Sequence, residues 1–166
     1  MSETTAEAGN QQVASPHPHP HPHPRCGPVG PVCCPIQFVC DGDFCVDEVR
    51  DNNGAPARVL EAKDPFSVLG RIEVRAGNAI TGTATVTIYA DQLGGPYDAA
   101  IGSVTVNITG DGTFNWTVTV PGGTLPDAPA GGSNLYRLAA VLTLVNSGGQ
   151  PTETSSFVTL GTYRIS

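Results

Sequence analysis

The sequence predicts an all-β fold of two packed antiparallel sheets, preceded by an N-terminal tail. The 166 residues include 20 Gly and 15 Pro, more than a helical protein normally carries. In residues 57–166 apolar side chains recur at every second position of several short runs, which is the period of a strand with one buried face. Turn residues such as Gly, Asn and Asp separate the runs. We therefore divide the chain into a tail at 1–56 and a β-sandwich domain at 57–166.

The first part of the tail contains no pattern that could build a core. Residues 1–15 are polar and have no hydrophobic period, so we expect them to be disordered. Residues 17–24 are four His-Pro pairs, and alternate prolines favour an extended polyproline II rod. All four histidines and all five cysteines of the chain lie between His17 and Cys45. The groups with the most reactive chemistry are thus predicted to lie outside the β domain.

The tail contains candidate metal ligands, because imidazole and thiolate bind zinc, copper and nickel. Two features count against a closed site. Neighbouring histidines of a polyproline rod point to different sides, and the cysteine-rich segment 26–45 has no Cys-x-x-Cys pair of the kind that zinc ribbons use. The alternatives are a disulfide-braced segment, whose fifth cysteine is free to bond another chain, or reduced thiols. The candidate ligands are His17, His19, His21, His23, Cys26, Cys33, Cys34, Cys40 and Cys45.

An acidic segment follows the cysteines and partly resembles a calcium-binding loop. Asp41 and Asp43 fit the first two ligand positions of an EF-hand. Val46, however, stands where the loop needs Gly, and Asn52 stands where it needs a bidentate Glu. We therefore expect a solvated acidic segment that ends in a turn at 51–54.

Seven strands are predicted in the β domain. The Gly110-Asp111-Gly112 turn predicts a tight hairpin between two of them, which would place Phe114 and Trp116 in the core. A second hairpin is expected to close the chain, and its first strand, 135–145, is apolar on both faces, which suits a central strand or one covered by a partner. The seven strands are expected near 57–62, 68–76, 83–90, 104–108, 114–120, 135–145 and 155–165.

One stretch resembles a known family. Leu125-Pro126, followed by residues 135–148 with Tyr136 near their start, is similar to the F strand of immunoglobulin-like and fibronectin type III-like domains. The resemblance covers 57–166 and implies a seven-stranded antiparallel immunoglobulin-like sandwich, in which Tyr136 matches the tyrosine corner. The long insertion 121–134 and the position of the single Trp on the fifth strand depart from the family's pattern.

Several classes of function are disfavoured by the composition. The β domain has no His and no Cys, so it lacks the usual base beside a nucleophile, and its carboxylates are spread singly; we expect no enzyme activity. A formal net charge of -7 with one Lys disfavours nucleic-acid binding. Neither a signal peptide nor a membrane span is recognisable, so the sequence predicts a cytoplasmic protein or export by a signal-less route.

The prediction for function is a non-catalytic structural or binding module, a component of a larger surface or particle assembly that is tethered through its N-terminal arm. The outer strand faces are rich in Thr and low in charge, which makes a protein partner or self-association physically available. The alternative is a metal-binding protein that uses the His-Pro and cysteine-rich tail for zinc, copper or nickel. No other cofactor is predicted.

Overall fold

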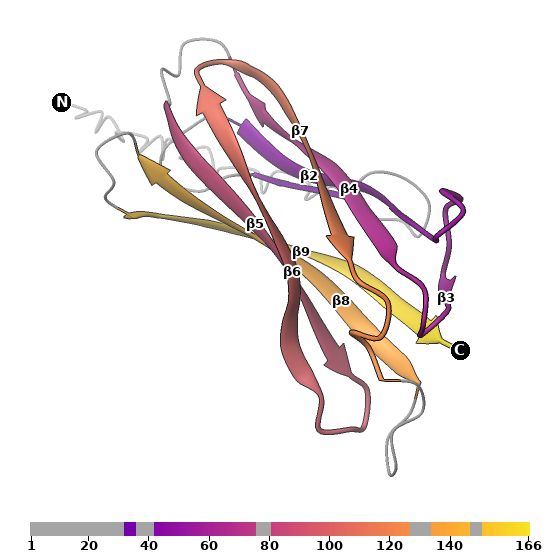
Figure 1. The fold of residues 1–166 in the computed structure, drawn as a ribbon. Helices are drawn as coiled ribbons and strands as arrows, with labels where there is room; N and C mark the ends of the chain where they lie inside the picture. Colours follow the sequence, from indigo (N-terminus) through magenta and orange to yellow (C-terminus); the bar gives the residue numbers. More distant parts are fainter. Residues whose placement is uncertain (1–31, 36–41, 76–80, 127–133, 147–150) are drawn as a thin grey trace, which may run out of the picture.

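Nine strands make up the described part of the chain, and the predicted all-β class is confirmed in the computed structural model (Figure 1). The structure describes residues 32–35, 42–75, 81–126, 134–146 and 151–166, with only the backbone at 32–35, 146 and 151–155. The strands are β1 (Val32–Pro35), β2 (Gly42–Arg50), β3 (Val59–Leu60), β4 (Phe66–Val74), β5 (Thr81–Gln92), β6 (Asp98–Thr109), β7 (Gly112–Val120), β8 (Leu135–Asn146) and β9 (Pro151–Ile165).

The strands form two sheets. The first sheet has four strands in the order β1-β2-β4-β7, and the second has five in the order β3-β9-β8-β5-β6 (Figure 1). Neighbouring strands are antiparallel except for β3, which runs parallel to β9 with Val59 beside Arg164 and Leu60 beside Ile165. The second sheet is therefore mixed, which differs from the purely antiparallel arrangement that we predicted.

Two of the nine strands come from residues that the sequence analysis assigned to the tail. β1 pairs with β2, and β2 pairs with β4, so the first sheet begins at Val32 rather than after residue 56. Phe44, Val46 and Val49 of β2 are buried in the core. The expected solvated acidic segment is thus wrong for 42–50. A β-bulge between Val46 and Glu48 interrupts the alternation of apolar and polar residues, which hides the strand in the sequence.

The predicted hairpin around Gly110-Asp111-Gly112 is also wrong. β6 pairs with β5 in the second sheet, whereas β7 pairs with β4 in the first, so this turn carries the chain from one sheet to the other. Gly110 and Gly112 adopt φ of 129° and 139°, a region that favours glycine. The two sheets share one core, so both strands still turn their apolar side chains inward. The closing hairpin of β8 and β9 is confirmed, and β8 lies inside its sheet as predicted.

An aromatic contact joins the strands of the first sheet on its inner side. The rings of Phe44 and Trp116 stack with their centroids 5.6 Å apart. Gly70 of β4 lies directly opposite Trp116 of β7, and a Cβ atom at this position would overlap the Trp116 ring and the carbonyl oxygen of Cys45. The core therefore requires glycine at position 70 to admit the indole.

Tyr136 fastens the segment that follows β7. Its side chain is fully buried, and its hydroxyl donates a hydrogen bond to the Pro126 carbonyl oxygen at 2.8 Å. The Tyr97 ring meets the Tyr136 ring edge-on at 5.8 Å, and the Tyr97 hydroxyl donates to the Thr124 carbonyl oxygen at 3.2 Å. Two tyrosines thus hold the described start of the predicted 121–134 insertion, whose residues 127–133 lie outside the described residues.

The C-terminal strand is held by β3 and the residues around it. The Ser166 amide donates to the Leu60 carbonyl and the Ala62 amide donates to the Ser166 carbonyl, both at 2.9 Å. The Arg58 guanidinium lies over the buried Tyr163 ring, 5.4 Å from its centroid, where a cation is attracted to the ring face. The second sheet therefore ends in an edge built from two distant parts of the chain.

Candidate functional site

The outer face of the first sheet contains a row of ion pairs. Arg75, the residue after β4, contacts Asp43 of β2 at 2.5 Å, and Arg71 of β4 contacts both Asp47 and Glu73. We call this surface the ion-pair face; its members are Asp43, Asp47, Glu48, Arg50, Arg71, Glu73 and Arg75. Two acidic side chains of the predicted solvated segment, Asp43 and Asp47, are paired with arginines that lie far away in the sequence.

Arg71 is the centre of this face. The hydrogen bond from its Nε to Glu73 is the main reason that its pKa is raised, and the Asp47 carboxylate beside it acts in the same direction. Both partners stay partly exposed, so water screens the pairs and each contributes little to stability. The ion-pair face is therefore a charged but largely self-satisfied surface.

The outer face of the second sheet has a different chemistry. Every large hydrophobic side chain that is exposed among the described residues belongs to a strand of this sheet. Each has a buried neighbour next to it in its strand, so each points outward. We call this surface the apolar face. Its large exposed side chains, with their relative exposure, are Val59 (46%), Tyr89 (41%), Leu135 (37%) and Phe157 (59%).

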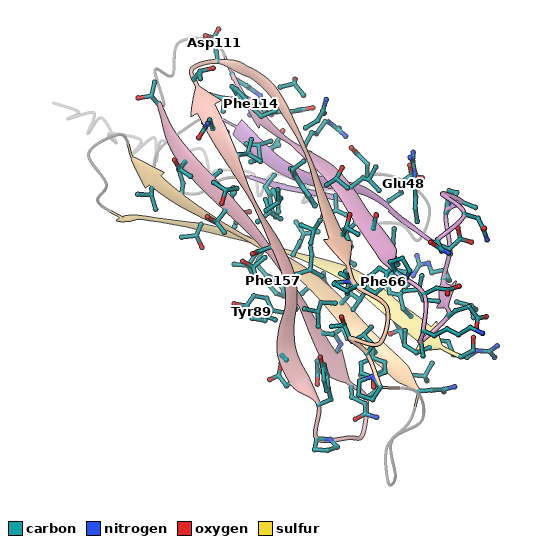
Figure 2. All side chains as sticks on the ribbon, viewed as in Figure 1. Glu48, Phe66, Tyr89, Asp111, Phe114 and Phe157 are labelled. Carbon is teal, nitrogen blue, oxygen red and sulfur yellow. The ribbon has the colours of Figure 1, made fainter. Side chains whose placement is uncertain are left out.

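Strand register brings the two aromatic members, Tyr89 and Phe157, to the middle of the apolar face. Phe157 of β9 lies opposite Val141 of β8, and Tyr89 of β5 lies opposite Ala139 of β8. Val141 and Ala139 are half-buried, so a strip of apolar surface connects the two rings across β8. In Figure 2 Tyr89 and Phe157 lie together over the second sheet, whereas Glu48 lies on the first.

Threonines border this strip, and the charged side chains that the structure describes on this face lie at one end. Thr87 and Thr159 occupy the same two rows of the register as Phe157 and Tyr89. Among the described side chains of this face, the charged ones gather where β8 begins and β9 ends, and Arg137 contacts Asp91 there at 3.9 Å. The charged members are Asp91, Asp98, Arg137 and Arg164. Their two positive and two negative charges give a formally neutral end.

The predicted metal ligands are only partly described. His17, His19, His21, His23, Cys26 and Cys40 lie outside the described residues, so the metal prediction for the tail stays a prediction. Cys33 and Cys34 lie in β1, and Cys45 lies in β2, where it is fully buried and disulfide-bonded. In this state Cys45 has no thiolate to offer a metal. Within the described ranges no three His, Cys, Asp or Glu side chains are grouped to hold a metal ion.

The apolar face was not predicted as a site from the sequence. Tyr89 and Phe157 lie in strands that were predicted near 83–90 and 155–165, but neither side chain was given a role. The available signal was alternation, since Phe157 falls out of phase with Val158 and Leu160, which are buried. What alternation could not supply was the pairing that sets β5, β8 and β9 side by side.

Comparison with known proteins gives no family for this chain. No protein-family model matches it, and no curated protein matches it. A crystal structure of Spo0M, a sporulation control protein from Bacillus subtilis, is similar over 75% of this chain at 13% identity with a TM-score of 0.39. The similar region spans 48% of the Spo0M chain. No helix within the part of the chain that the structure describes is long and apolar enough to cross a membrane.

Proposed function

We propose that this chain is a non-catalytic structural or binding module that belongs to a larger assembly, and that it associates with a second copy of itself through the apolar face. The observation that carries the proposal is the exposure of Tyr89 and Phe157 on one face of one sheet. Removal of exposed aromatic side chains from water by a partner lowers the free energy of the complex. Aromatic side chains are also enriched in protein interfaces. Residues 1–31 would then be the tether.

Charge favours a second copy as the partner. The chain has a formal net charge of -7, so two copies repel each other overall. The apolar face is an exception, since its described charges, Asp91, Asp98, Arg137 and Arg164, cancel. In a two-fold symmetric pair, the arginines of one copy can face the aspartates of the other. The described charges of this face therefore add no net repulsion to a close approach of two copies.

The proposed fold type is an immunoglobulin-like sandwich with additions. In that fold one sheet contains the strands A, B and E and the other contains G, F, C and C′. The orders β2-β4-β7 and β9-β8-β5-β6 fit these series, and the bond from Tyr136 to the Pro126 carbonyl fits a tyrosine corner. β1 and the parallel β3 would then be extra edge strands. The apolar face would correspond to the outer side of the G-F-C-C′ sheet.

Sedimentation velocity of the full chain over a range of concentrations tests the proposed self-association. We expect a reversible monomer-dimer equilibrium in the unmodified protein. Phe157→Ser should weaken it at least tenfold, because burial of an exposed Phe contributes roughly 1.5–3 kcal/mol and each 1.4 kcal/mol corresponds to about a factor of ten. A protein that stays monomeric at all concentrations would rule out the second copy as partner.

A matched pair of charge substitutions separates the apolar face from general surface effects. Thr159 and Thr117 are both exposed threonines in strands, but Thr159 lies on the apolar face and Thr117 lies on the outer face of the first sheet. Thr159→Glu should abolish the dimer, because it places an unpaired charge in the interface, whereas Thr117→Glu should leave it unchanged. Equal effects of the two variants would show that the association uses another surface.

A further inference from the structure

The bonding partner of Cys45 can be inferred from strand register. Cys45 is disulfide-bonded, and the chain contains only four other cysteines, Cys26, Cys33, Cys34 and Cys40. In the pairing of β1 with β2, Cys33 lies directly opposite Cys45, and Cys34 lies opposite Phe44. Directly opposite residues of an antiparallel pair share one face of the sheet, while successive residues alternate between faces.

The two faces of β2 distinguish Cys33 from Cys34, the two candidates in β1. Phe44 stacks on Trp116 inside the core, so the inner face of β2 is the one that contains Phe44. Cys45 is the next residue and lies opposite Arg71, whose side chain belongs to the ion-pair face. Position 45 is thus on the outer face, and its fully buried side chain must be covered there by neighbouring groups. Of the two cysteines in β1, the register places only position 33 on this outer face.

The backbone spacing of such a pair suits a disulfide. Directly opposite Cα atoms of antiparallel strands are about 4.5–5.5 Å apart, which falls within the range of about 4.4–6.8 Å that disulfides span. We propose that Cys33 and Cys45 form a disulfide across β1 and β2, and that this bond fastens β1 to the edge of the first sheet. β1 has four residues and pairs only with β2, so its backbone hydrogen bonds alone give it few contacts.

The bond requires an oxidant, and a low-molecular-weight disulfide such as oxidised glutathione is sufficient. One cysteine thiolate attacks this disulfide, forms a mixed disulfide and releases one glutathione thiolate. The second cysteine thiolate then attacks the protein sulfur of the mixed disulfide and releases the other glutathione thiolate. The two cysteines lose two protons and two electrons in total, and oxidised glutathione is reduced to two thiols.

The bond has a consequence for the edge of the first sheet. While it is closed, β1 covers the edge of β2, which is nine residues long and pairs with β4 on its other side. Reduction would allow β1 to leave and would expose the hydrogen-bonding groups of β2 that now face β1. An uncovered strand edge is a site where another strand can add. The proposed bond therefore makes the accessibility of this edge dependent on the redox conditions.

Disulfide mapping of the unreduced full chain tests the pairing directly. Free thiols are alkylated, the protein is cleaved on the amino side of its aspartates, and the linked peptides are sequenced by electron-transfer fragmentation, which separates the adjacent Cys33 and Cys34. We expect the peptide that contains Cys45 to be linked to Cys33. A link from Cys45 to Cys26, Cys34 or Cys40, or an alkylated Cys45, would overturn the proposal.

Two serine variants provide a matched control in the same strand. Cys33→Ser should leave Cys45 open to alkylation, whereas Cys34→Ser should leave Cys45 protected and linked as in the unmodified chain.

Hydrogen exchange with and without a thiol reductant tests whether the bond fastens β1 to the sheet. Reduction should speed exchange at 32–35 and in β2 by at least tenfold and leave β8 unchanged. Equal exchange in the two redox states would show that the bond does not hold β1 in place.

Discussion

Phe44 stacks on Trp116 at a centroid distance of 5.6 Å, and this contact joins β2 to β7, two strands of the first sheet that are not paired with each other. It lies on the inner side of the sheet, where both side chains are buried. Phe44 belongs to residues that the sequence analysis assigned to the tail. The contact therefore makes this part of the chain a structural element of the core, and its energetic weight can be measured.

Truncation of Phe44 should be strongly destabilising. Phe44→Ala removes a fully buried ring and leaves a cavity against Trp116, so we expect the free energy of unfolding to fall by about 3–5 kcal/mol in urea denaturation. Phe157→Ala is the matched control, since it removes an exposed ring and should change stability by less than about 0.5 kcal/mol. If both variants lost the same stability, β2 would not be part of the core.

A methyl group at position 70 should disturb the same region from the other side. Gly70→Ala places a Cβ atom against the Trp116 ring and the Cys45 carbonyl oxygen, and overpacking of this kind costs about 1–3 kcal/mol. Trp116 is the only tryptophan of the chain, so its fluorescence reports the local change. Unfolding followed by this signal should occur at lower urea concentration. An unchanged midpoint would mean that the indole has room to move.

Loss of the Tyr136 hydroxyl should cost one buried hydrogen bond. Tyr136→Phe keeps the ring but leaves the Pro126 carbonyl oxygen without this donor, so we expect about 1–2 kcal/mol less stability. Tyr89→Phe removes the hydroxyl of an exposed ring and should have almost no effect. Chemical denaturation of the two variants compares them directly. Equal stability would show that the bond contributes nothing measurable.

Stability should fall in alkaline solution because of buried tyrosines. Burial raises the pKa of Tyr163, and the Arg58 cation over the ring offsets part of this shift; burial also raises the pKa of Tyr97. A folded-state pKa above the unfolded value of about 10 means that the folded protein holds its proton more tightly. Its stabilising contribution is thus present below about pH 10 and is lost as pH rises further.

Substitution of Tyr163 tests this dependence. Denaturation of the unmodified chain near pH 8 and near pH 11 should show lower stability at the higher pH, and Tyr163→Phe should reduce the difference because it removes one of the titrating groups. A difference of the same size in Tyr163→Phe would assign the alkaline instability to other groups.

The sequence predicted seven strands in 57–166, where the structure has β3 to β9, and alternation predicted the buried face of several of them. Trp116 points inward, as predicted. The same alternation turns Val86 and Ile88 inward and Thr105, Thr117 and Thr119 outward. Alternation did not predict the partner of each strand. The Gly110-Asp111-Gly112 turn suits a hairpin and a crossing between sheets equally well, because both leave the apolar side chains of β6 and β7 in one shared core.

β2 and the two outer faces could not be predicted for a related reason. Asp43 and Asp47 look like a solvated segment until Arg71 and Arg75 are placed beside them, and these arginines become neighbours only when β2 pairs with β4. Likewise Tyr89 and Phe157 are separated by most of the β domain in the sequence. Local pattern thus identified strands and inward faces, whereas every feature that depends on pairing between distant strands required the structure.

The order of the strands has a consequence for how the chain reaches this fold. β4 pairs with β7, β5 pairs with β8, and β3 pairs with β9, so the ladders that complete each sheet close large loops of backbone. Closing such loops loses chain entropy before the contacts form, so refolding is expected to take milliseconds to seconds rather than microseconds. Until β8 pairs, the edge of β5 that faces it has unpaired hydrogen-bonding groups that other chains can reach. The refolding protein is therefore more prone to aggregation than the native one.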